Sequence, residues 1–290
     1  MIKKGILVAA GAGSRLAPLS SSFTKHLFPI YDKPMIFYSL SILLLAGIRD
    51  ISLVTKSKDL NLYKSLLGNG SRYGIKIKYV IQNKPKGIAD ALLLNLKFIK
   101  NDSVCVVLGD NIIYGDTLSS KLKSLAQKNN RASIFGYYVN NPSEFGIVNF
   151  NTKNNIVSLK EKPKKPKSNW AVPGVYFYDD TLTSKLKKIK PSNRKELEIT
   201  DVNQLYLKEN KLDLILLGRG YAWLDMGTYE SIQEASNFIS AIEKRQGLKI
   251  GCIEEICFNN NWINKKNMQY FVKKYRGTQY GEYLKSIMNK

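Results

Sequence analysis

Residues 4–19 read KGILVAAGAGSRLAPL. This stretch begins as a short apolar run rich in the residue types that favour buried strands. The run is followed by glycine, alanine and serine residues and then by a single arginine, Arg15. A buried strand that ends in a loop of small residues is typical of open α/β sheets, which bind ligands at the carboxyl ends of their strands.

Similar apolar runs recur along the first half of the chain, with helical patterns between them. The strand candidates are DISLVTK (50–56), IKYVIQ (77–82), SVCVVLGD (103–110) and ASIFGYYV (132–139). The helix candidates are KPMIFYSLSILLLAG (33–47), GIADALLLNLKFI (87–99) and TLSSKLKSLAQKN (117–129). This alternation predicts a three-layer α/β fold with a mostly parallel central sheet flanked by helices.

The second half of the chain changes character. Residues 145–163 predict a β-hairpin, because two short apolar runs flank an Asn-rich turn. Residues 227–247 predict a long helix, and the aromatic residues of 248–290 predict a packed helical appendage. The fold is therefore expected to carry a small hairpin insertion and a helical tail.

The amino-acid composition predicts the kind of binding partner and the cellular compartment. The 290 residues are 44% hydrophobic and 23% charged, as in a globular protein. The net charge of +22 comes from lysines spread over the chain, so we expect no nucleic-acid partner. Attraction of anionic small substrates by this positive charge is an alternative role. The first apolar run is too short to span a membrane. Three cysteines without a CxxC pattern predict free buried thiols and a cytoplasmic protein.

The loop after the first strand matches neither common nucleotide motif. GAGSRL lacks the third glycine of GxGxxG, and no GxxxxGK[ST] pattern is present. The backbone N–H groups of residues 11–13 could still approach an anion, with Arg15 and Lys25 beside it. A glycine turn with two solvated cations is the alternative.

Two aspartates follow apolar runs, Asp110 in VVLGDN and Asp225 in YAWLDMG. Carboxylates at the carboxyl ends of strands, without multiple histidines nearby, suit Mg²⁺ that also binds phosphate oxygens. The single histidine, His26, excludes a multi-histidine metal site. Each aspartate alone could equally cap a turn or a helix.

The chain resembles the short bacterial glucose-1-phosphate thymidylyltransferases of the sugar nucleotidyltransferase group over essentially its whole length. The motifs that carry the resemblance are AGAGSRLAP (10–18), KHLFPIYDKPMIFYSLSILLLAGIR (25–49), YVIQNKPKGIADA (79–91), LGDNIIYG (108–115), EFGIVNF (144–150), SLKEKPKKPKSNWAVPGVYFYD (158–179), ELEITDVN (196–203) and GRGYAWLDMGT (218–228). Their number and order make the match specific.

The resemblance implies a Mg²⁺-dependent transfer of deoxythymidylate from dTTP to glucose 1-phosphate, the first step of dTDP-deoxysugar synthesis such as that of dTDP-rhamnose for polysaccharides. It implies that Arg15, Lys25, Lys162, Asp110 and Asp225 are catalytic, and that Asp110 and Asp225 hold the metal. The implied nucleotide-binding residues are Ala9, Gly11, Ala12, Gly13, Arg15, Gln82, Gly87 and Asp110. The implied sugar-phosphate-binding residues are Asn111, Gly146, Glu161, Lys162, Val172, Tyr176 and Glu196.

Several departures from the family pattern keep the substrate open. Ala10 stands where the family has glycine, and His26 and Asp90 each replace a glutamine. Pro173 and Met226 each replace a threonine. UTP or another hexose 1-phosphate is therefore an alternative substrate. A noncatalytic sensor of nucleotide sugars is the alternative function outside the enzymes.

The resemblance also implies one nucleotidyltransferase domain over residues 1–290. Within it, residues 1–140 are expected to bind mainly the nucleotide, 141–230 mainly the sugar phosphate, and 231–290 to form the helical tail. A homotetramer is implied, with an end-product inhibitor site between subunits near Tyr114, Gly115, Arg219 and Glu255.

Overall fold

The computed structural model describes residues 1–128, 130–153 and 155–289. Within these ranges a ten-stranded sheet forms the centre of the molecule, in the order β10-β9-β11-β8-β12-β6-β1-β4-β5, with β13 paired to β8. The strands are β1 (Lys4–Val8), β4 (Asp50–Thr55), β5 (Lys76–Ile81), β6 (Val104–Leu108), β8 (Ala132–Tyr138), β9 (Gly146–Phe150), β10 (Ile156–Glu161), β11 (Trp170–Ala171), β12 (Val175–Tyr178) and β13 (Leu212–Leu217).

The sheet has a parallel half and a mixed half. Strands β6, β1, β4 and β5 are parallel neighbours, and β1 lies between β4 and β6. On the other side, β12 runs antiparallel to both β6 and β8, while β11 and β10 each run antiparallel to β9. Within the described part of the central sheet, β10, β11 and β12 therefore run against the direction of the other strands. The predicted fold class, a mostly parallel sheet with flanking helices, is confirmed.

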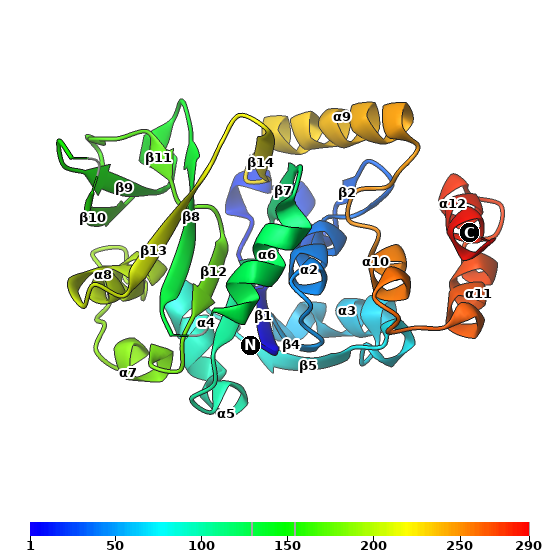
Figure 1. Cartoon of the computed structure of the whole chain (residues 1–290), viewed down its shortest axis with the longest axis horizontal. Coiled ribbons are helices and arrows are strands. Elements are labelled where there is room, and N and C mark those ends of the chain that lie inside the picture. Colours follow the sequence, from blue (N-terminus) through cyan, green and yellow to red (C-terminus); the bar gives the residue numbers. More distant parts are fainter. Residues whose placement is uncertain (129, 154, 290) are drawn as a thin grey trace.

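Helices cover both faces of this sheet (Figure 1). They are α1 (Leu19–Ser22), α2 (Met35–Leu45), α3 (Leu60–Leu67), α4 (Ile88–Leu94), α5 (Leu96–Ile99), α6 (Leu118–Gln127), α7 (Leu182–Leu186), α8 (Ile199–Lys208), α9 (Tyr229–Gln246), α10 (Ile253–Asn259), α11 (Lys265–Lys274) and α12 (Gln279–Asn289). Helix α2 is apolar all round because it packs against β6, β7, α6 and α10, which leaves residues 35–44 buried.

The helix predicted over 87–99 is broken at Asn95. Its side-chain Nδ2 donates to the Ala91 carbonyl and its Oδ1 accepts from Ser52 Oγ. An asparagine that bonds to the preceding turn and to a neighbouring strand competes with regular helical geometry, so two short helices replace one. Three residues lie outside the described ranges. They are Asn129, the last residue of the helix predicted over 117–129, Asn154 in the predicted hairpin turn, and Lys290.

Two small sheets supplement the central one. Strands β7 (Asn111–Gly115) and β14 (Tyr221–Asp225) pair antiparallel, with Asp225 opposite Asn111. Strands β2 (Pro29–Ile30) and β3 (Lys33–Pro34) form a short hairpin. The β7–β14 pair brings residues more than a hundred positions apart to the edge of the central sheet where a cleft opens.

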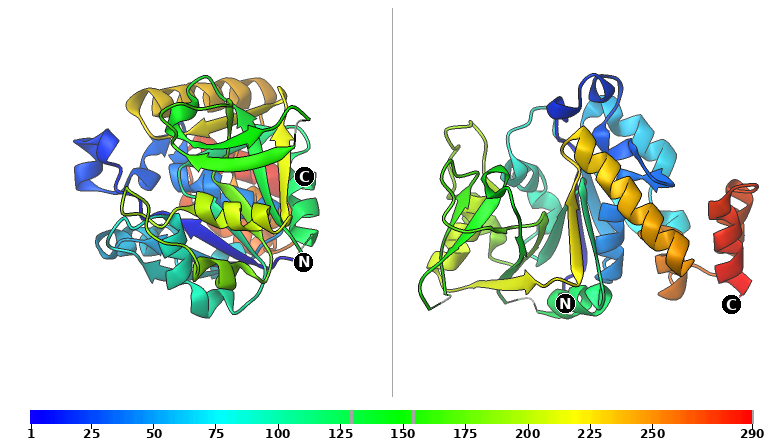
Figure 2. Two further views of the ribbon diagram at one scale, coloured as in Figure 1. Left: turned by 90° about the vertical axis from the view of Figure 1, so that its left-hand side faces the viewer. Right: turned by 90° about the horizontal axis from the view of Figure 1, so that it is seen from above.

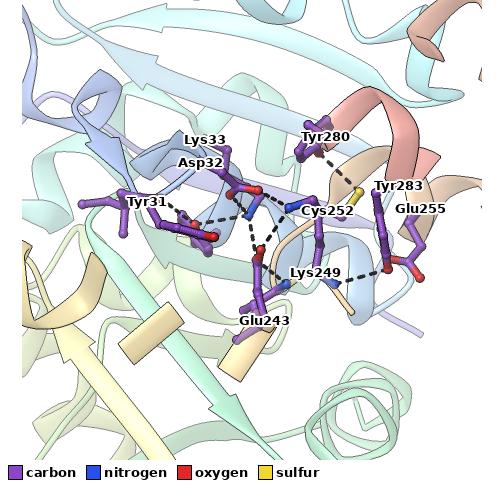
Figure 3. A network of polar contacts seen from close by, with 12 residues as sticks. Tyr31, Asp32, Lys33, Glu243, Lys249, Cys252, Glu255, Tyr280 and Tyr283 are labelled. Carbon is purple, nitrogen blue, oxygen red and sulfur yellow. Dashed lines mark hydrogen bonds and ion pairs between the residues drawn. The ribbon is translucent and has the colours of Figure 1, made fainter. Parts of the chain in front are cut away.

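The helical tail is joined to the body by a partly buried polar network (Figure 3). Lys33 Nζ lies 3.0 Å from Glu243 Oε1, and Lys249 Nζ lies 3.1 Å from the other oxygen of Glu243. Asp32 pairs with both lysines. Further along the tail, Tyr280 donates to Glu254 at 2.6 Å.

The views agree that α11 and α12 stand at the end of the molecule opposite β9 and β10 (Figures 1 and 2). All three cysteines are free and buried, as predicted. No helix in the described ranges is both long and apolar enough to cross a membrane.

Candidate active site

A cleft of about 520 Å³ opens at the carboxyl ends of β1, β5 and β6 and continues toward β9 and β12. Most of the side chains predicted from the sequence line it: Gly11, Ala12, Gly13, Arg15, Lys25, Gln82, Gly87, Asp110, Asn111, Gly146, Glu161, Lys162, Val172, Tyr176, Glu196 and Asp225. Ala9 does not. It is 1% exposed, and its N–H donates to the Val54 carbonyl as a continuation of the sheet.

The loop after β1 forms one wall of the cleft. Gly13 has φ +65°, which a glycine adopts without steric cost, and Ser20 Oγ donates to its carbonyl at 2.7 Å. A single helical turn, Ser14–Leu16, follows and presents Arg15 at the rim. The turn buries Leu16 and leaves Arg15 half-exposed, so the arginine can reach a ligand.

The two predicted metal-ligating aspartates reach the cleft from different sheets. Asp110 follows β6 of the central sheet, as expected. Asp225 does not end a strand of that sheet, because among the described strands β14 pairs with β7 alone. The antiparallel register places Asp225 opposite Asn111, and Met226 N–H donates to the Asp110 carbonyl at 3.1 Å. The two aspartates therefore become neighbours through β7.

Lys25 and the two aspartates form one electrostatic unit. Lys25 Nζ donates to a carboxylate oxygen of Asp110 and lies 3.5 Å from the Met226 carbonyl. Burial opposes ionisation of Asp110, but the Lys25 ammonium outweighs it and lowers the pKa to about 2. Burial, and then the negative charge of Asp110, raise the pKa of Asp225 to about 6. A cation between the carboxylates would relieve this repulsion.

The Asn111 side chain links Asp110 to Trp223 of β14 and to the Gly174 backbone. Its Nδ2 donates to Asp110 Oδ1 at 3.0 Å. Its Oδ1 accepts from Trp223 Nε1 at 2.6 Å and from the Gly174 N–H at 3.0 Å. The side chain is 2% exposed, so these bonds fix its orientation.

The opposite wall is rich in carboxylates. Thr200 Oγ1 donates to Glu161 Oε2, and burial raises the pKa of Glu161 above its usual range. Arg194 donates to Glu198 and, at 3.0 Å, to Glu196. This set offers several acceptors and one guanidinium, a combination that suits a polyhydroxylated, phosphorylated ligand.

Comparison with known proteins identifies the class. Residues 4–242 match the family described as nucleotidyl transferase. The chain belongs to the nucleotidyl transferase family. It is 47% identical to the glucose-1-phosphate thymidylyltransferase of Neisseria meningitidis, over 99% of this chain and all of the relative, and 45% identical to that of Mycolicibacterium smegmatis, over 99% of each.

Solved structures agree. A putative glucose-1-phosphate thymidylyltransferase from Bacillus anthracis, in complex with a sucrose, aligns with a TM-score of 0.74 at 38% identity, covering 81% of this chain and 94% of that one. A UDP-glucose pyrophosphorylase complexed with UDP-glucose aligns with a TM-score of 0.72 at 27% identity, covering 85% and 100%. This chain is a nucleotidyltransferase by fold and by sequence.

Enzymes of this family use a divalent metal, and the donor set fits one. Among the described residues, no three His, Cys, Asp or Glu side chains gather into a metal cage. The candidate metal ligands are therefore the two neighbouring carboxylates of Asp110 and Asp225. A hard cation held by one or two carboxylates completes its coordination with water and substrate phosphates, so a two-aspartate site is sufficient.

Sequence reasoning missed several cleft residues, namely Glu144, Arg194, Glu198, Thr200, Asn203 and Trp223. Arg194 and Glu198 flank the predicted Glu196, and their charge pattern was the available signal. Glu144 gave none, because its role depends on a contact with Arg15 that joins distant parts of the chain. Trp223 acts through Asn111, which sequence spacing could not reveal.

Proposed function

We propose that this chain transfers the deoxythymidylyl group of dTTP to glucose 1-phosphate and releases pyrophosphate. One observation carries the proposal: one cleft is lined by Arg15 and Lys25 from the N-terminal stretch and by Asp110, Lys162 and Asp225 from distant parts of the sequence. The full-length similarity to glucose-1-phosphate thymidylyltransferases supports the choice of substrates.

In the proposed reaction a phosphate oxygen of glucose 1-phosphate attacks the α-phosphorus of dTTP. A new P–O bond forms, the bond between the α-phosphorus and the bridging oxygen breaks, and pyrophosphate leaves with the electron pair. No covalent protein intermediate is needed. Catalysis then consists of holding the two anions in line and neutralising their charge, as in other phosphoryl transfers.

The residues of this chain divide that task. Arg15 and the N–H groups of residues 11–13 bind the triphosphate, and Lys25 neutralises charge near the α-phosphate. Lys162 on the opposite side binds the phosphate of the sugar. Asp110 and Asp225 would hold Mg²⁺, which when bound neutralises phosphate charge and fixes the geometry of the triphosphate.

Recognition of the two substrates would use the two ends of the cleft. Gln82 and Gly87 are proposed to read the base. Gly87 has φ +98°, and a Cβ there would lie 2.3 Å from the Leu197 carbonyl oxygen, so only glycine fits. Gly146, Glu161, Val172, Tyr176 and Glu196 are proposed to line the sugar pocket, with Asn111 bracing the metal aspartate.

A specific observation keeps UTP as the second candidate nucleotide. The chain also aligns with a UDP-glucose pyrophosphorylase, although at lower identity than with the thymidylyltransferases. A thymine methyl group in an apolar pocket contributes only about 1 to 3 kcal/mol of discrimination. We therefore expect dTTP to be preferred and UTP to be used more slowly.

Assembly and compartment are proposed on the same basis. We expect a homotetramer with an end-product inhibitor site between subunits, which light scattering with and without nucleotide sugars would test. The three buried free thiols support a reducing compartment such as the cytoplasm.

The direct test is pyrophosphate release with glucose 1-phosphate and Mg²⁺, comparing dTTP, UTP, dCTP and no nucleotide. Fastest release with dTTP supports the proposal. Fastest release with UTP would change the nucleotide, and release with none would favour a sensor.

A further inference from the structure

The base-side wall of the cleft contains a glutamine whose amide is held from behind. Gln82 follows β5 directly, and its N–H donates to the Thr55 carbonyl at 2.9 Å. The residue is only 6% exposed, yet it lines the cleft. Its side-chain Nε2 donates to Asp90 Oδ2 at 2.8 Å and to the Gly87 carbonyl at 3.1 Å.

The chemistry of these two partners fixes which way the amide points. An ionised carboxylate and a backbone carbonyl accept hydrogen bonds and donate none. The NH₂ group of Gln82 must therefore face Asp90 and Gly87, and both of its hydrogens are used. Among the described residues, no group donates to Gln82 Oε1. The carbonyl oxygen is the end of the amide left for a ligand.

Asp90 itself stands behind the wall. It lies in the first turn of α4 and is half-buried, and it is not among the residues that line the cleft. A ligand in the cleft would therefore contact the Gln82 amide, and Asp90 would act only by holding that amide in place. The Gly87 carbonyl, in a loop tied to Leu197, supplies the second acceptor.

We propose that Asp90 is a positioning residue for nucleotide specificity: it locks the Gln82 amide so that the cleft presents a hydrogen-bond acceptor to the edge of the base. This inference rests on the proposed function. Thymine and uracil carry an imide N–H that donates to such an acceptor. Cytosine has a bare ring nitrogen at the same place, so two acceptors would face each other at a cost. The device therefore selects imide bases and does not separate dTTP from UTP.

Binding measurements separate this inference from the proposed reaction. Calorimetry with Mg²⁺ would give the dissociation constants of dTTP and of 5-methyl-dCTP, which keeps the methyl group but lacks the imide N–H. The variants are Asp90→Ala, Asp90→Asn and Gln82→Ala. Glu230→Ala is the matched control, since it also removes an acidic residue from the first turn of a helix, α9.

We expect the wild type to prefer dTTP by roughly tenfold or more, since a buried acceptor without a donor is costly. Asp90→Ala should lose most of that preference, because the amide keeps only its 3.1 Å bond to the Gly87 carbonyl and can rotate to offer its NH₂ to cytosine. Gln82→Ala should lose it as well. Asp90→Asn, which keeps an acceptor oxygen, should retain most of it, and Glu230→Ala all of it.

The inference is overturned if Asp90→Ala keeps the wild-type ratio of dissociation constants, including the case in which both affinities fall equally. It is also overturned if the wild type shows no preference or binds neither nucleotide. A wild type that binds dTTP selectively, loses that selectivity in Asp90→Ala and yet releases no pyrophosphate would support the inference while rejecting the proposed function.

Discussion

Arg15 and Glu144 form an ion pair across the cleft, with 2.9 Å between Nη1 and Oε2. Arg15 follows β1, whereas Glu144 ends the helical turn Pro142–Glu144 that precedes β9. The pair therefore joins the two walls. Both side chains are about half exposed, at 53% and 55%, so the pair is weak. A bound triphosphate would compete with Glu144 for the guanidinium.

Substitution of Glu144 should tighten nucleotide binding. In Glu144→Gln, Arg15 loses its competing partner and the cleft loses a negative charge that repels phosphate. We expect the KM for dTTP to fall about twofold to fivefold with kcat little changed, the scale of an exposed ion pair. Steady-state kinetics would measure both. Glu282→Gln on α12 is the matched control, and a KM that stays the same or rises would show that Glu144 does not restrain Arg15.

Removal of Arg15 should have the opposite effect. Arg15→Ala deletes a charged donor at the proposed triphosphate site, and we expect kcat/KM for dTTP to fall roughly a hundredfold. Arg15→Lys should recover part of this loss because it keeps the charge. Wild-type kinetics in Arg15→Ala would make the arginine a solvated surface cation.

The two-aspartate metal site can be tested by isosteric substitution. Asp225→Asn removes a charged ligand while keeping the shape of the side chain. We expect turnover to fall at least about a hundredfold, with a higher Mg²⁺ concentration needed for half-maximal rate. A Mg²⁺ titration of pyrophosphate release measures both quantities. A near wild-type rate at ordinary Mg²⁺ concentration would eliminate Asp225 as a ligand.

His26 should make the folded state sensitive to acid. Burial, reinforced by the Lys25 charge, lowers its pKa to about 3, whereas an unfolded histidine titrates near pH 6.5. The unfolded chain therefore binds this proton first, so stability is fully present above about pH 6.5 and is lost as the pH falls toward 3.

His26→Gln should remove that component. Between pH 7 and pH 5 the wild type should lose about 2 kcal/mol more unfolding free energy than the variant. Urea denaturation at the two pH values gives the comparison. Equal losses in the two proteins would mean that His26 is not kept neutral by the fold.

The network that anchors the tail should be sensitive to loss of one partner. Lys33 and Glu243 are almost fully buried, with side-chain exposures of 2% and 4%. Glu243→Gln leaves Asp32 as the one carboxylate that pairs with Lys33 and Lys249 among the described residues, and we expect a loss of about 3 kcal/mol in unfolding free energy. The double variant Lys33→Met/Glu243→Gln should recover much of it. A Glu243→Gln protein as stable as the wild type would contradict this account of the network.

The sequence predicted the fold class well because the signals were local. Apolar runs and intervening helical patterns are properties of short segments, and they place β1, β4, β5 and β6 without knowledge of the partners. The break at Asn95 was not predicted because it depends on contacts with Ala91 in α4 and with Ser52 in β4, which is distant in the sequence.

The candidate site was less predictable where it depends on pairing between distant segments. Asp225 was expected on the central sheet, yet it reaches Asp110 through the β7–β14 pair, which no local pattern reveals. Glu144 was not predicted either, because its contact with Arg15 joins distant parts of the chain. The sequence marks Asp90 only as a replacement of a glutamine, and the structure is needed to show that Gln82 stands between it and the cleft.

The most direct test of the central claim follows the α-phosphorus. The enzyme would be incubated with Mg²⁺, dTTP carrying radioactive phosphorus at the α position and glucose 1-phosphate carrying radioactive carbon. The account predicts one product that carries both labels, formed in step with unlabelled pyrophosphate. Labelled phosphorus that appears only in dTMP or dTDP, or that stays in dTTP, would contradict the claim that this chain joins the two substrates.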